Sequence, residues 1–516
     1  MGRSSDQANS EYLEVERKFE VFESTVSPSF EGLASVSRVE RSPSQHLDAV
    51  YFDTPGHDLA AHHITLRRRT GGTDAGWHLK LPASDVAAAA APGSDVAAAA
   101  APAGPDARTE VRAPLGDDSN ANAVPANLLD VVLAIVRDRP VVPVAHIATS
   151  RTVDTLYGAD GIALAEFCDD DVVARAEDQE SEQRWREWEV ELAGGADRDL
   201  LDRLTNRLLD AGAVVAGHGS KLARVLDGEA LDVPVEPPAD PVHRAVAEQV
   251  EQLLVWDRAV RADADDSVHQ MRVTTRKIRS LLQASEGAFG ISDDAWILDE
   301  LRQLAAVLGG ARDAEVLAER YERALDELPG ELVRGPVRQR LVDGAKKHYQ
   351  SGLRRSLIAM RSQRYFRLLD ALEALVAAEP PTRQPGAALA QLTIGSAYKR
   401  VRKAAKAAAH AADADRDEAL HRIRKGAKRL RYTAAATGDD KVSERAKTIQ
   451  TLLGDHQDSV VSRTHLSHQA EAAHAAGEDT FTYGLLYQLE DNLARRSRGQ
   501  LGGALKKLDR SVRKAD

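Results

Sequence analysis

The sequence predicts a multidomain α+β protein, in which an N-terminal eight-stranded antiparallel β barrel precedes an all-α helical bundle. Between residues 11 and 226, short segments with period-two alternation are separated by Gly, Pro and Asp turns, which is typical of strands. From His243 onward the strand signals vanish, and long helical periods rich in Ala, Leu and Arg follow. Between the two regions lies LDVPVEPPADP, residues 231–241, whose prolines predict a stiff interdomain linker.

The bulk composition is that of a globular protein with more than one domain. Its 516 residues exceed the usual size of one hydrophobic core, and 29% charged with 43% hydrophobic residues argues against a disordered or membrane-embedded chain. No apolar run reaches the roughly 18 residues that span a bilayer, and MGRSSDQANS at the N-terminus has no apolar signal core. The single Cys168 excludes an intrachain disulfide and a cysteine-built zinc site. We therefore expect a cytoplasmic protein.

The net charge of −12 conceals a difference between the two halves. Residues 1–240 hold 22 Lys and Arg against 42 Asp and Glu, a balance of −20, whereas residues 241–516 hold 46 against 38, a balance of +8. An acidic half joined to a basic half suggests a metal-binding region next to a polyanion-binding region.

The first half contains eight candidate strands after a disordered tail at residues 1–10. The candidates are residues 11–21, 46–54, 63–70, 76–82, 107–115, 143–157, 161–176 and 183–193. Residues 126–137 and 198–211 are predicted to be helical, and the second of these segments is amphipathic. Eight antiparallel strands with few intervening helices predict a closed barrel.

The first strand is unusual because Glu14, Glu16, Lys18 and Glu20 share one face. Neighbouring carboxylates on one face repel one another unless a positive charge lies between them, and a divalent cation would supply that charge. The alternative is an edge strand whose charged face is simply in water.

Later strands repeat the charged face. The residues concerned are Thr65, Arg67 and Arg69, Lys80, Arg108, Glu110 and Arg112, Arg151, and Glu187, Glu189 and Glu191, followed by Lys221 and Arg224. If these faces point outward, Trp188, Val190 and Leu192 could fill the barrel instead. If they point inward, the lumen is stable only when a metal and an anion complete its charge balance.

Residues 11–230 resemble the CYTH domains, also called triphosphate tunnel metalloenzymes. The resemblance rests on EVERK, on AVYFDTPGHDLAAHHITLRRRTGG and on GWHLKLP, in that order. It implies that the charged faces line an eight-stranded tunnel that binds triphosphate. The Ala- and Pro-rich tandem repeat at residues 83–105 departs from the pattern and is predicted to be an expanded hairpin loop without a role in the site.

The resemblance also implies a metal site and a phosphate site. Glu14 and Glu16 would bind Mg²⁺ or Mn²⁺ together with Glu189 and Glu191, and Glu166 or Asp169 would add a further ligand, with Glu166 the better match by period. The phosphate oxygens would contact Arg67, Arg69, Lys80, Arg108, Arg151, Lys221 and Arg224. Lys18, next to Glu16 in the catalytic strand, would hold a phosphate or the attacking water during in-line attack.

The second half, residues 242–512, is predicted to be a bundle of eight or more helices with an internal repeat. VHQMRVTTRKIRSLL and LHRIRKGAKRLRYTA carry basic residues at offsets of 0, 3, 7 and 10, which fall on one stripe of a helix. The first stripe is His269, Arg272, Arg276 and Arg279, and the second is His421, Arg424, Lys428 and Arg431. Each is followed by a matching hinge segment, LAAVLGGARDAEVL or LLGDHQDSVV.

Residues 241–510 resemble the CHAD domain, the conserved histidine α-helical domain often found behind CYTH domains. The resemblance implies that the two stripes form one cationic groove for polyphosphate, flanked by Lys277, Lys425 and Arg429. Nucleic acid is a competing polyanion, but aromatic residues are only 4% of the chain and Tyr432 alone lies among the stripes for base stacking. A histidine that contacts phosphate is a simpler account of His269 and His421 than a metal ligand or a catalytic base.

Together these patterns predict metal-dependent hydrolysis of inorganic triphosphate or short polyphosphate in the tunnel, with polyphosphate bound by the helical domain. Two alternatives stay open: cyclization of ATP, as in class IV adenylate cyclases, and a non-catalytic polyphosphate-binding adaptor. Binding of polyphosphate would also allow association with polyphosphate granules.

Overall fold

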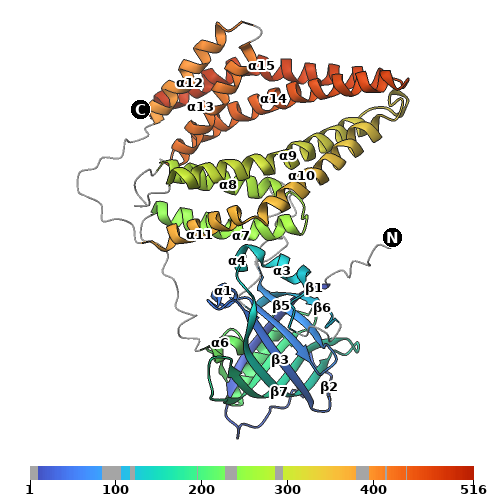
Figure 1. The fold of residues 1–516 in the computed structure, drawn as a ribbon, viewed down its shortest axis with the longest axis vertical. Coiled ribbons are helices and arrows are strands. Elements are labelled where there is room, and N and C mark those ends of the chain that lie inside the picture. Colours follow the sequence, from blue (N-terminus) through green and yellow to red (C-terminus); the bar gives the residue numbers. More distant parts are fainter. Residues whose placement is uncertain are drawn as a thin grey trace, which may run out of the picture. The chain divides into compact units, whose positions relative to one another are not determined.

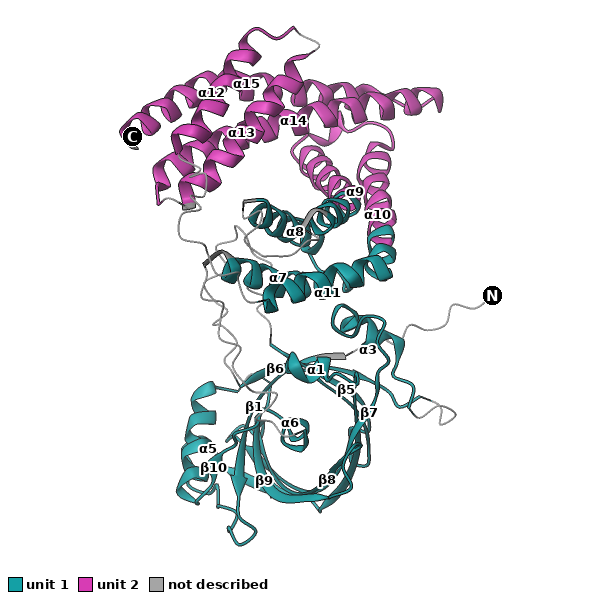
Figure 2. Cartoon of the chain, turned by 60° about the vertical axis from the view of Figure 1, so that its left-hand side comes forward, with its two compact units in different colours: residues 1–308, 355–380 teal, residues 309–354, 381–516 magenta. Residues whose placement is uncertain are grey.

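A computed structural model describes residues 10–83, 106–116, 122–194, 196–226, 241–284, 294–378, 394–412, 415–436 and 438–515. The chain forms two compact units, shown in Figure 2. Unit 1 comprises residues 1–308 and 355–380, and unit 2 comprises residues 309–354 and 381–516. Apart from their edges, the predicted tail at 1–10, the loop expansion at 83–105 and the linker at 231–241 lie outside the described residues.

The first part of unit 1 is a closed antiparallel barrel of eight strands, as the sequence predicts. The ring runs β1-β6-β5-β4-β3-β7-β8-β9 and closes by pairing β9 with β1, while the short β2 and β10 are added at its sides. The strands are β1 (Ser10–Val21), β2 (Arg38–Arg41), β3 (Gln45–Asp53), β4 (Thr65–Thr70), β5 (Gly76–Pro82), β6 (Ala107–Ala113), β7 (Val142–Tyr157), β8 (Ala163–Ala176), β9 (Gln183–Leu192) and β10 (Val214–Val215).

Strand β1 closes the ring. Its first half, Ser10–Val15, pairs with β6, and its second half, Glu16–Val21, pairs with β9. This register places Glu16 opposite Glu191 and Lys18 opposite Glu189. The Glu-x-Glu-x-Lys strand therefore lies at the point where both ends of the sheet meet.

Two parts of the barrel's outer face are apolar and covered by helices. On one side, α5 (Arg198–Asp210) packs its leucines over Phe19, Trp188 and Val190. On the other side, α1 (Asp58–Ala61), α3 (Ala126–Val131) and α4 (Leu133–Val136) cover Leu66, Trp77 and Leu79. Because side chains alternate along a strand, the charged residues between these positions point into the lumen. The alternative of charged faces in open water is therefore wrong for these strands.

One end of the lumen is filled by the short helix α6 (Lys221–Val225), which Figure 2 shows inside the ring of strands. Leu222 and Val225 of α6 pack against Tyr51, Ile147 and Val172 of the barrel wall. The Ser220 hydroxyl caps α6 by accepting a hydrogen bond from the Ala223 amide at 3.1 Å. The lumen thus has an apolar end that anchors α6 and a charged end next to it.

Unit 1 continues into helices α7 (Pro241–Arg261), α8 (Ser267–Ala284), the start of α9 (Asp294–Asp326), the end of α10 (Gly344–Met360) and α11 (Gln363–Ala377). Ion pairs join the barrel to these helices. Arg137, which follows α4, pairs with Asp370 and Glu373 of α11, and Asp130 of α3 accepts from Arg261 at 3.2 Å. The barrel is therefore held to α7 and α11 through its α3–α4 segment.

Unit 2 contains the rest of α9 and α10, the short turns η2 (Gly330–Leu332) and η3 (Gln339–Asp343), and helices α12 (Ile394–Ala409), α13 (Arg416–Ala436), α14 (Asp440–Ala475) and α15 (Phe481–Ala515). The long helices α14 and α15 run side by side (Figure 1). Helices α9 and α10 approach closely at Gly352, where a Cβ atom would lie 2.7 Å from the Cα of Ala311. With α7 to α15 in the described residues, the prediction of a large helical region is confirmed.

Candidate functional site

The charged end of the lumen is a cavity of about 580 Å³, counting the space at its mouth. Charged side chains from six strands and from α6 line it. They are Glu14, Glu16, Lys18, Arg67, Arg69, Lys80, Arg108, Glu110, Arg112, Arg151, Glu189, Glu191 and Lys221, together with Asp74 from a loop. Tyr51, Thr65, Gly219 and Ser220 complete the wall.

Three glutamates, Glu14, Glu16 and Glu191, form a carboxylate cluster at the seam of the barrel. The Lys80 ammonium lies 2.5 Å from Glu14 and 3.6 Å from Glu16, and Lys18 lies 3.1 Å from Glu16. Among the described residues, no side chain forms an ion pair with Glu191. Arg112 lies 3.6 Å from Glu14 but pairs more closely with Glu110, so the seam cluster holds more negative charge than its two lysines neutralise.

The protonation behaviour of the seam cluster reflects this excess. Burial raises the pKa of Glu14 to about 7, and although Lys80 opposes the shift, Glu110 and Glu191 add to it. Burial also raises the pKa of Glu191. Burial acts on Glu16 as well, but Lys18 and Lys80 outweigh it and hold the pKa of Glu16 at about 2. Carboxylate oxygens whose negative charge is not balanced by nearby cations suit a hard divalent cation such as Mg²⁺ or Mn²⁺.

The two candidates for an additional ligand on β8 face opposite ways. Glu166 lies opposite Glu191 in the β8–β9 ladder and therefore on the lumen side, although its side chain is exposed. Asp169 lies opposite Trp188 on the outer face, where it accepts from Arg186 at 2.6 and 2.8 Å and from Ser27 at 2.5 Å. The placement expected for Asp169 is therefore wrong, because a step of three residues along a strand changes its face.

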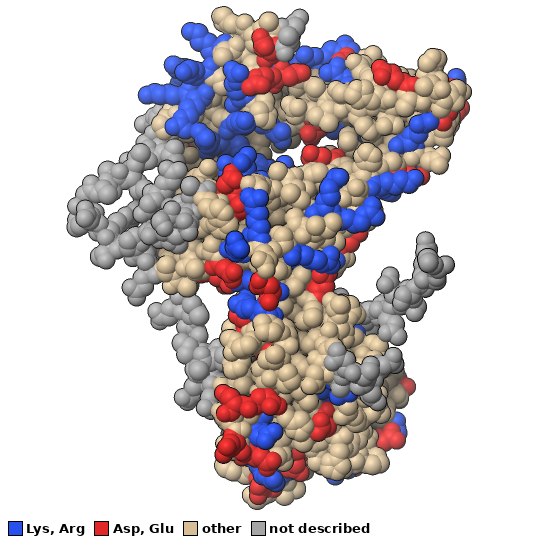
Figure 3. Space-filling view, viewed as in Figure 1, with Lys and Arg blue, Asp and Glu red and all other residues tan. Residues whose placement is uncertain are grey.

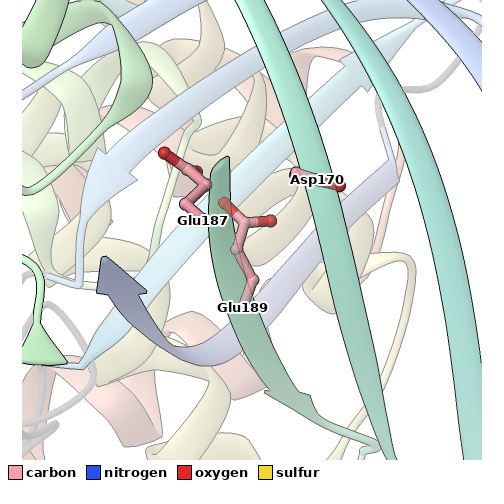
Figure 4. A group of neighbouring side chains, drawn as sticks. All are labelled: Asp170, Glu187 and Glu189. Carbon is pink, nitrogen blue, oxygen red and sulfur yellow. The ribbon is translucent and has the colours of Figure 1, made fainter. Parts of the chain in front are cut away.

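A second carboxylate cluster was missed by sequence reasoning. Asp170, Glu187 and Glu189 bring carboxylate oxygens within 4.8 Å of one another in the wall of the barrel (Figure 4). The Lys221 ammonium lies 2.9, 2.6 and 2.7 Å from these three residues. Period two from Glu166 through Cys168 leads to Asp170, so the strand pattern contained the signal for this residue.

The opposite wall carries guanidinium groups. Arg67 donates to the Tyr51 hydroxyl at 3.2 Å, and Arg69, which is 5% exposed, pairs with Asp74. Burial lowers the pKa of Arg69 to about 9, and the nearby Arg67 and Arg151 lower it further. The Nε atoms of Arg67 and Arg69 are also buried without a hydrogen-bond partner among the described residues. This wall therefore favours an anion.

The other predicted phosphate contacts are placed less uniformly. Arg108 lines the cavity and donates to the Gly219 carbonyl at 3.0 Å. Arg224 does not line it, because its guanidinium lies 3.3 Å from Glu20 and over the Trp185 ring at the α6 end. Arg112, which was noted on the charged face of its strand but not assigned to the site, lines the cavity.

The two basic stripes lie on α8 and α13, which belong to different compact units. Their proposed union in one groove therefore stays a prediction. Arg272 donates to the Ala305 carbonyl at 3.2 Å, and Arg431 to the Gln450 side chain at 3.4 Å, whereas Arg276 is exposed. His269, Arg279, His421, Arg424 and Lys428 are half-buried. Figure 3 shows Lys and Arg gathered on the face of unit 2 around α12 and α13.

Comparisons with known proteins agree with both resemblances. The CYTH domain family matches residues 13–224, and the CHAD domain family matches residues 244–467. The uncharacterized proteins MT2285 and Rv2226, from two strains of Mycobacterium tuberculosis, are each 66% identical to this chain, and the alignment covers 98% of both chains.

Solved structures that match parts of the chain are more remote in sequence. PptA from Streptomyces chartreusis has 20% identity and a TM-score of 0.43, and the match covers 52% of this chain and 99% of that one. The CHAD domain from the plant Ricinus communis has 22% identity and a TM-score of 0.41, over 52% and 90%. The putative adenylyl cyclase HpAC1 from Hippeastrum, described with a dominant triphosphatase activity, has 19% identity and a TM-score of 0.24, over 42% and 96%.

Proposed function

Because this chain belongs to the proteins that join a CYTH domain to a CHAD domain, we propose that its barrel is a metal-dependent phosphohydrolase for inorganic triphosphate or short polyphosphate. The helical region would bind polyphosphate through the stripes on α8 and α13. No helix in the described part of the chain has the length and apolar character that a membrane span requires.

The observation that carries the proposal is the separation of unmet charge inside one cavity. The seam cluster of Glu14, Glu16 and Glu191 includes a carboxylate, Glu191, without an ion pair among the described residues. The wall with Arg67 and Arg69 has buried guanidinium nitrogens without a hydrogen-bond partner in the same part of the chain. A metal complex of a phosphate chain carries both signs and would satisfy both walls at once.

Each side chain then has a role that follows from its charge. Glu14, Glu16 and Glu191 would hold the metal, with Glu166 at the edge and Glu189 next to them. The metal would neutralise phosphate oxygens and lower the pKa of a bound water. Arg67, Arg69, Lys80, Arg108 and Arg151 would bind phosphate oxygens and stabilise the charge that develops during in-line attack.

Lys18 acts as a fixed cation rather than as a base. Burial opposes its charge, but Glu16 and Glu189 hold the pKa of Lys18 above its ordinary value. Its ammonium lies 2.6 Å from Glu189 and 3.1 Å from Glu16, so it remains protonated between them. In this position Lys18 orients the carboxylates and can donate to a phosphate oxygen or to the attacking water.

Phosphate release from a substrate panel tests the proposal. The panel contains inorganic triphosphate, polyphosphates of several lengths, ATP and thiamine triphosphate, each with Mg²⁺ or Mn²⁺. We expect release from triphosphate or short polyphosphate, and a loss of at least 100-fold in Glu16→Gln, which keeps the shape of the side chain but removes its charge. Glu40→Gln on the exposed strand β2 is the matched control.

The alternatives predict different products. A cyclase would convert ATP to cyclic AMP and pyrophosphate, and an adaptor would bind polyphosphate without releasing phosphate from any substrate. If the wild-type protein releases no phosphate from any substrate of the panel with either metal, the proposal that the barrel is an enzyme is wrong. If Glu16→Gln still binds polyphosphate, the binding by the helical region is independent of the activity of the tunnel.

A further inference from the structure

The carboxylates of the barrel fall into two clusters with different charge balance. The first is the seam cluster of Glu14, Glu16 and Glu191. The second, here called the lysine cage, consists of Asp170, Glu187 and Glu189 around the Lys221 ammonium. By the positions of its oxygen atoms alone, the lysine cage is the better place for a metal ion.

The lysine cage is already neutralised by cations of the chain. Besides Lys221, Arg151 forms a two-pronged contact with Asp170 at 2.6 and 2.7 Å and reaches Glu189 at 2.5 Å. Lys18 lies 2.6 Å from Glu189. Three carboxylates therefore meet three cations. The seam cluster has Lys80 and shares Lys18, and Arg112 reaches Glu14 only at 3.6 Å because it pairs more closely with Glu110. Glu191 has no ion pair among the described residues.

Lys221 is held in the cage by the fold. It is the first residue of α6, and Leu222 and Val225 anchor that helix in the apolar end of the lumen with 1% and 0% exposure. Lys221 itself is 8% exposed, and Asp170 is fully buried. Displacing the ammonium with a metal ion would leave a buried charge without a partner, which is strongly unfavourable.

We propose that Lys221 is a built-in cation that occupies the lysine cage, so that the phosphate-free tunnel binds one divalent ion, at the seam cluster, and none in the cage. The inference rests on the proposed metal site but not on turnover. It makes Lys221 a positioning residue that determines how many metal ions the phosphate-free tunnel holds.

Counting bound Mn²⁺ in the full-length protein without any phosphate tests this proposal. Electron paramagnetic resonance of free Mn²⁺ gives the number of ions bound to metal-stripped protein. We expect Glu191→Gln to remove one ion from the wild-type count and Glu187→Gln to remove none, because the second substitution changes only the cage. Loss of an ion in Glu187→Gln would overturn the proposal.

A second pair of variants tests the same point from the other side. Lys221→Met keeps the length of the side chain but removes its charge, and we expect it to bind one more Mn²⁺ than the wild type. Adding Glu187→Gln to Lys221→Met should abolish that extra ion. If Lys221→Met folds and binds no extra ion, Lys221 is not a substitute for metal.

Folding of Lys221→Met is monitored in the same experiment. Three buried carboxylates without their lysine should lower the thermal midpoint in the metal-free state, and Mn²⁺ should raise it by more than it raises the wild type. If the variant does not fold at all, the comparison of Glu187→Gln with Glu191→Gln still decides the question. If the tunnel binds metal as proposed but the protein releases no phosphate, the proposed enzymatic function is wrong and the proposal for Lys221 stands.

Discussion

The barrel lumen and the two basic stripes are both built from charged residues that recur with the period of their secondary structure, but only the lumen encloses them. In the lumen, carboxylates and cations face each other across a closed ring. Glu14, Arg69 and Lys221 each keep less than a tenth of their surface exposed. On α8 and α13 the stripe residues are half-buried or exposed. An enclosed charge interacts more strongly with other charges, because water and salt screen it less.

The largest effect is expected from substitutions in the wall of the lumen that carries Arg67 and Arg69. Combined Arg67→Ala and Arg69→Ala substitutions should lower kcat/KM for triphosphate by about 100- to 1000-fold, because buried guanidiniums that bind an anion are worth several kcal/mol. Polyphosphate binding by the helical region should not change. Arg68→Ala, on the other face of β4, is the control, and a loss of equal size there would contradict the assignment.

The stripes should respond mainly through salt dependence. Replacing Arg272, Arg276, Arg424 and Arg431 with Ala should weaken polyphosphate binding by about 10- to 100-fold at low salt, and should flatten the slope of log affinity against log salt by about one unit per lost contact. Triphosphate turnover should be unaffected. A control variant loses four exposed arginines outside the stripes, Arg302, Arg338, Arg422 and Arg495. Equal weakening by both variants would mean that net charge alone is responsible.

A buried and a half-buried histidine should differ in their effect on stability. Burial lowers the pKa of His78 to about 4, although its bond to Glu110 at 2.9 Å opposes the shift. A folded-state pKa below the unfolded value means that the unfolded chain binds the proton more tightly. The free energy of unfolding is therefore highest, as far as His78 determines it, above pH 6.5. It falls by about 3 kcal/mol as the pH falls towards 4.

Thermal unfolding between pH 4 and pH 7, followed by tryptophan fluorescence, measures this effect. His78→Gln should reduce the fall in the thermal midpoint towards low pH. His421→Gln on the half-buried stripe should change the pH profile much less. Equal changes in the two variants would show that the pH dependence does not arise in the barrel.

The smallest effect concerns the two carboxylates of β8. Glu166→Gln should weaken Mn²⁺ binding by about threefold to tenfold, because Glu166 is exposed at the edge of the seam cluster. Asp169→Asn should leave Mn²⁺ binding unchanged, since its carboxylate is held by Arg186 on the outer face. The reverse result would show that β8 presents its other face to the metal.

Much of the lumen could be predicted because strand periodicity and barrel closure leave few choices. Once the apolar residues around Trp188 must be covered from outside, Glu187, Glu189 and Glu191 have to point inward. The same logic places Arg67 and Arg69 opposite Leu66. The expectation for Asp169, the second candidate after Glu166, is wrong because the strict alternation of β8 places Asp170 on the lumen face instead.

What the sequence by itself determined is which residues share a face, because the periods of strands and helices are properties of the local backbone. The eight strands, the shared charged face of the Glu-x-Glu-x-Lys strand and the basic stripes all follow from those periods, whereas the inward direction of that face was implied by the resemblance to CYTH domains. Only the tertiary structure decided which charges meet. It sends Lys221 to Asp170, Glu187 and Glu189, and leaves Glu191 without an ion pair among the described residues. Partners so distant along the chain are brought together by the packing of α6 and the closure of the barrel, which no local period encodes.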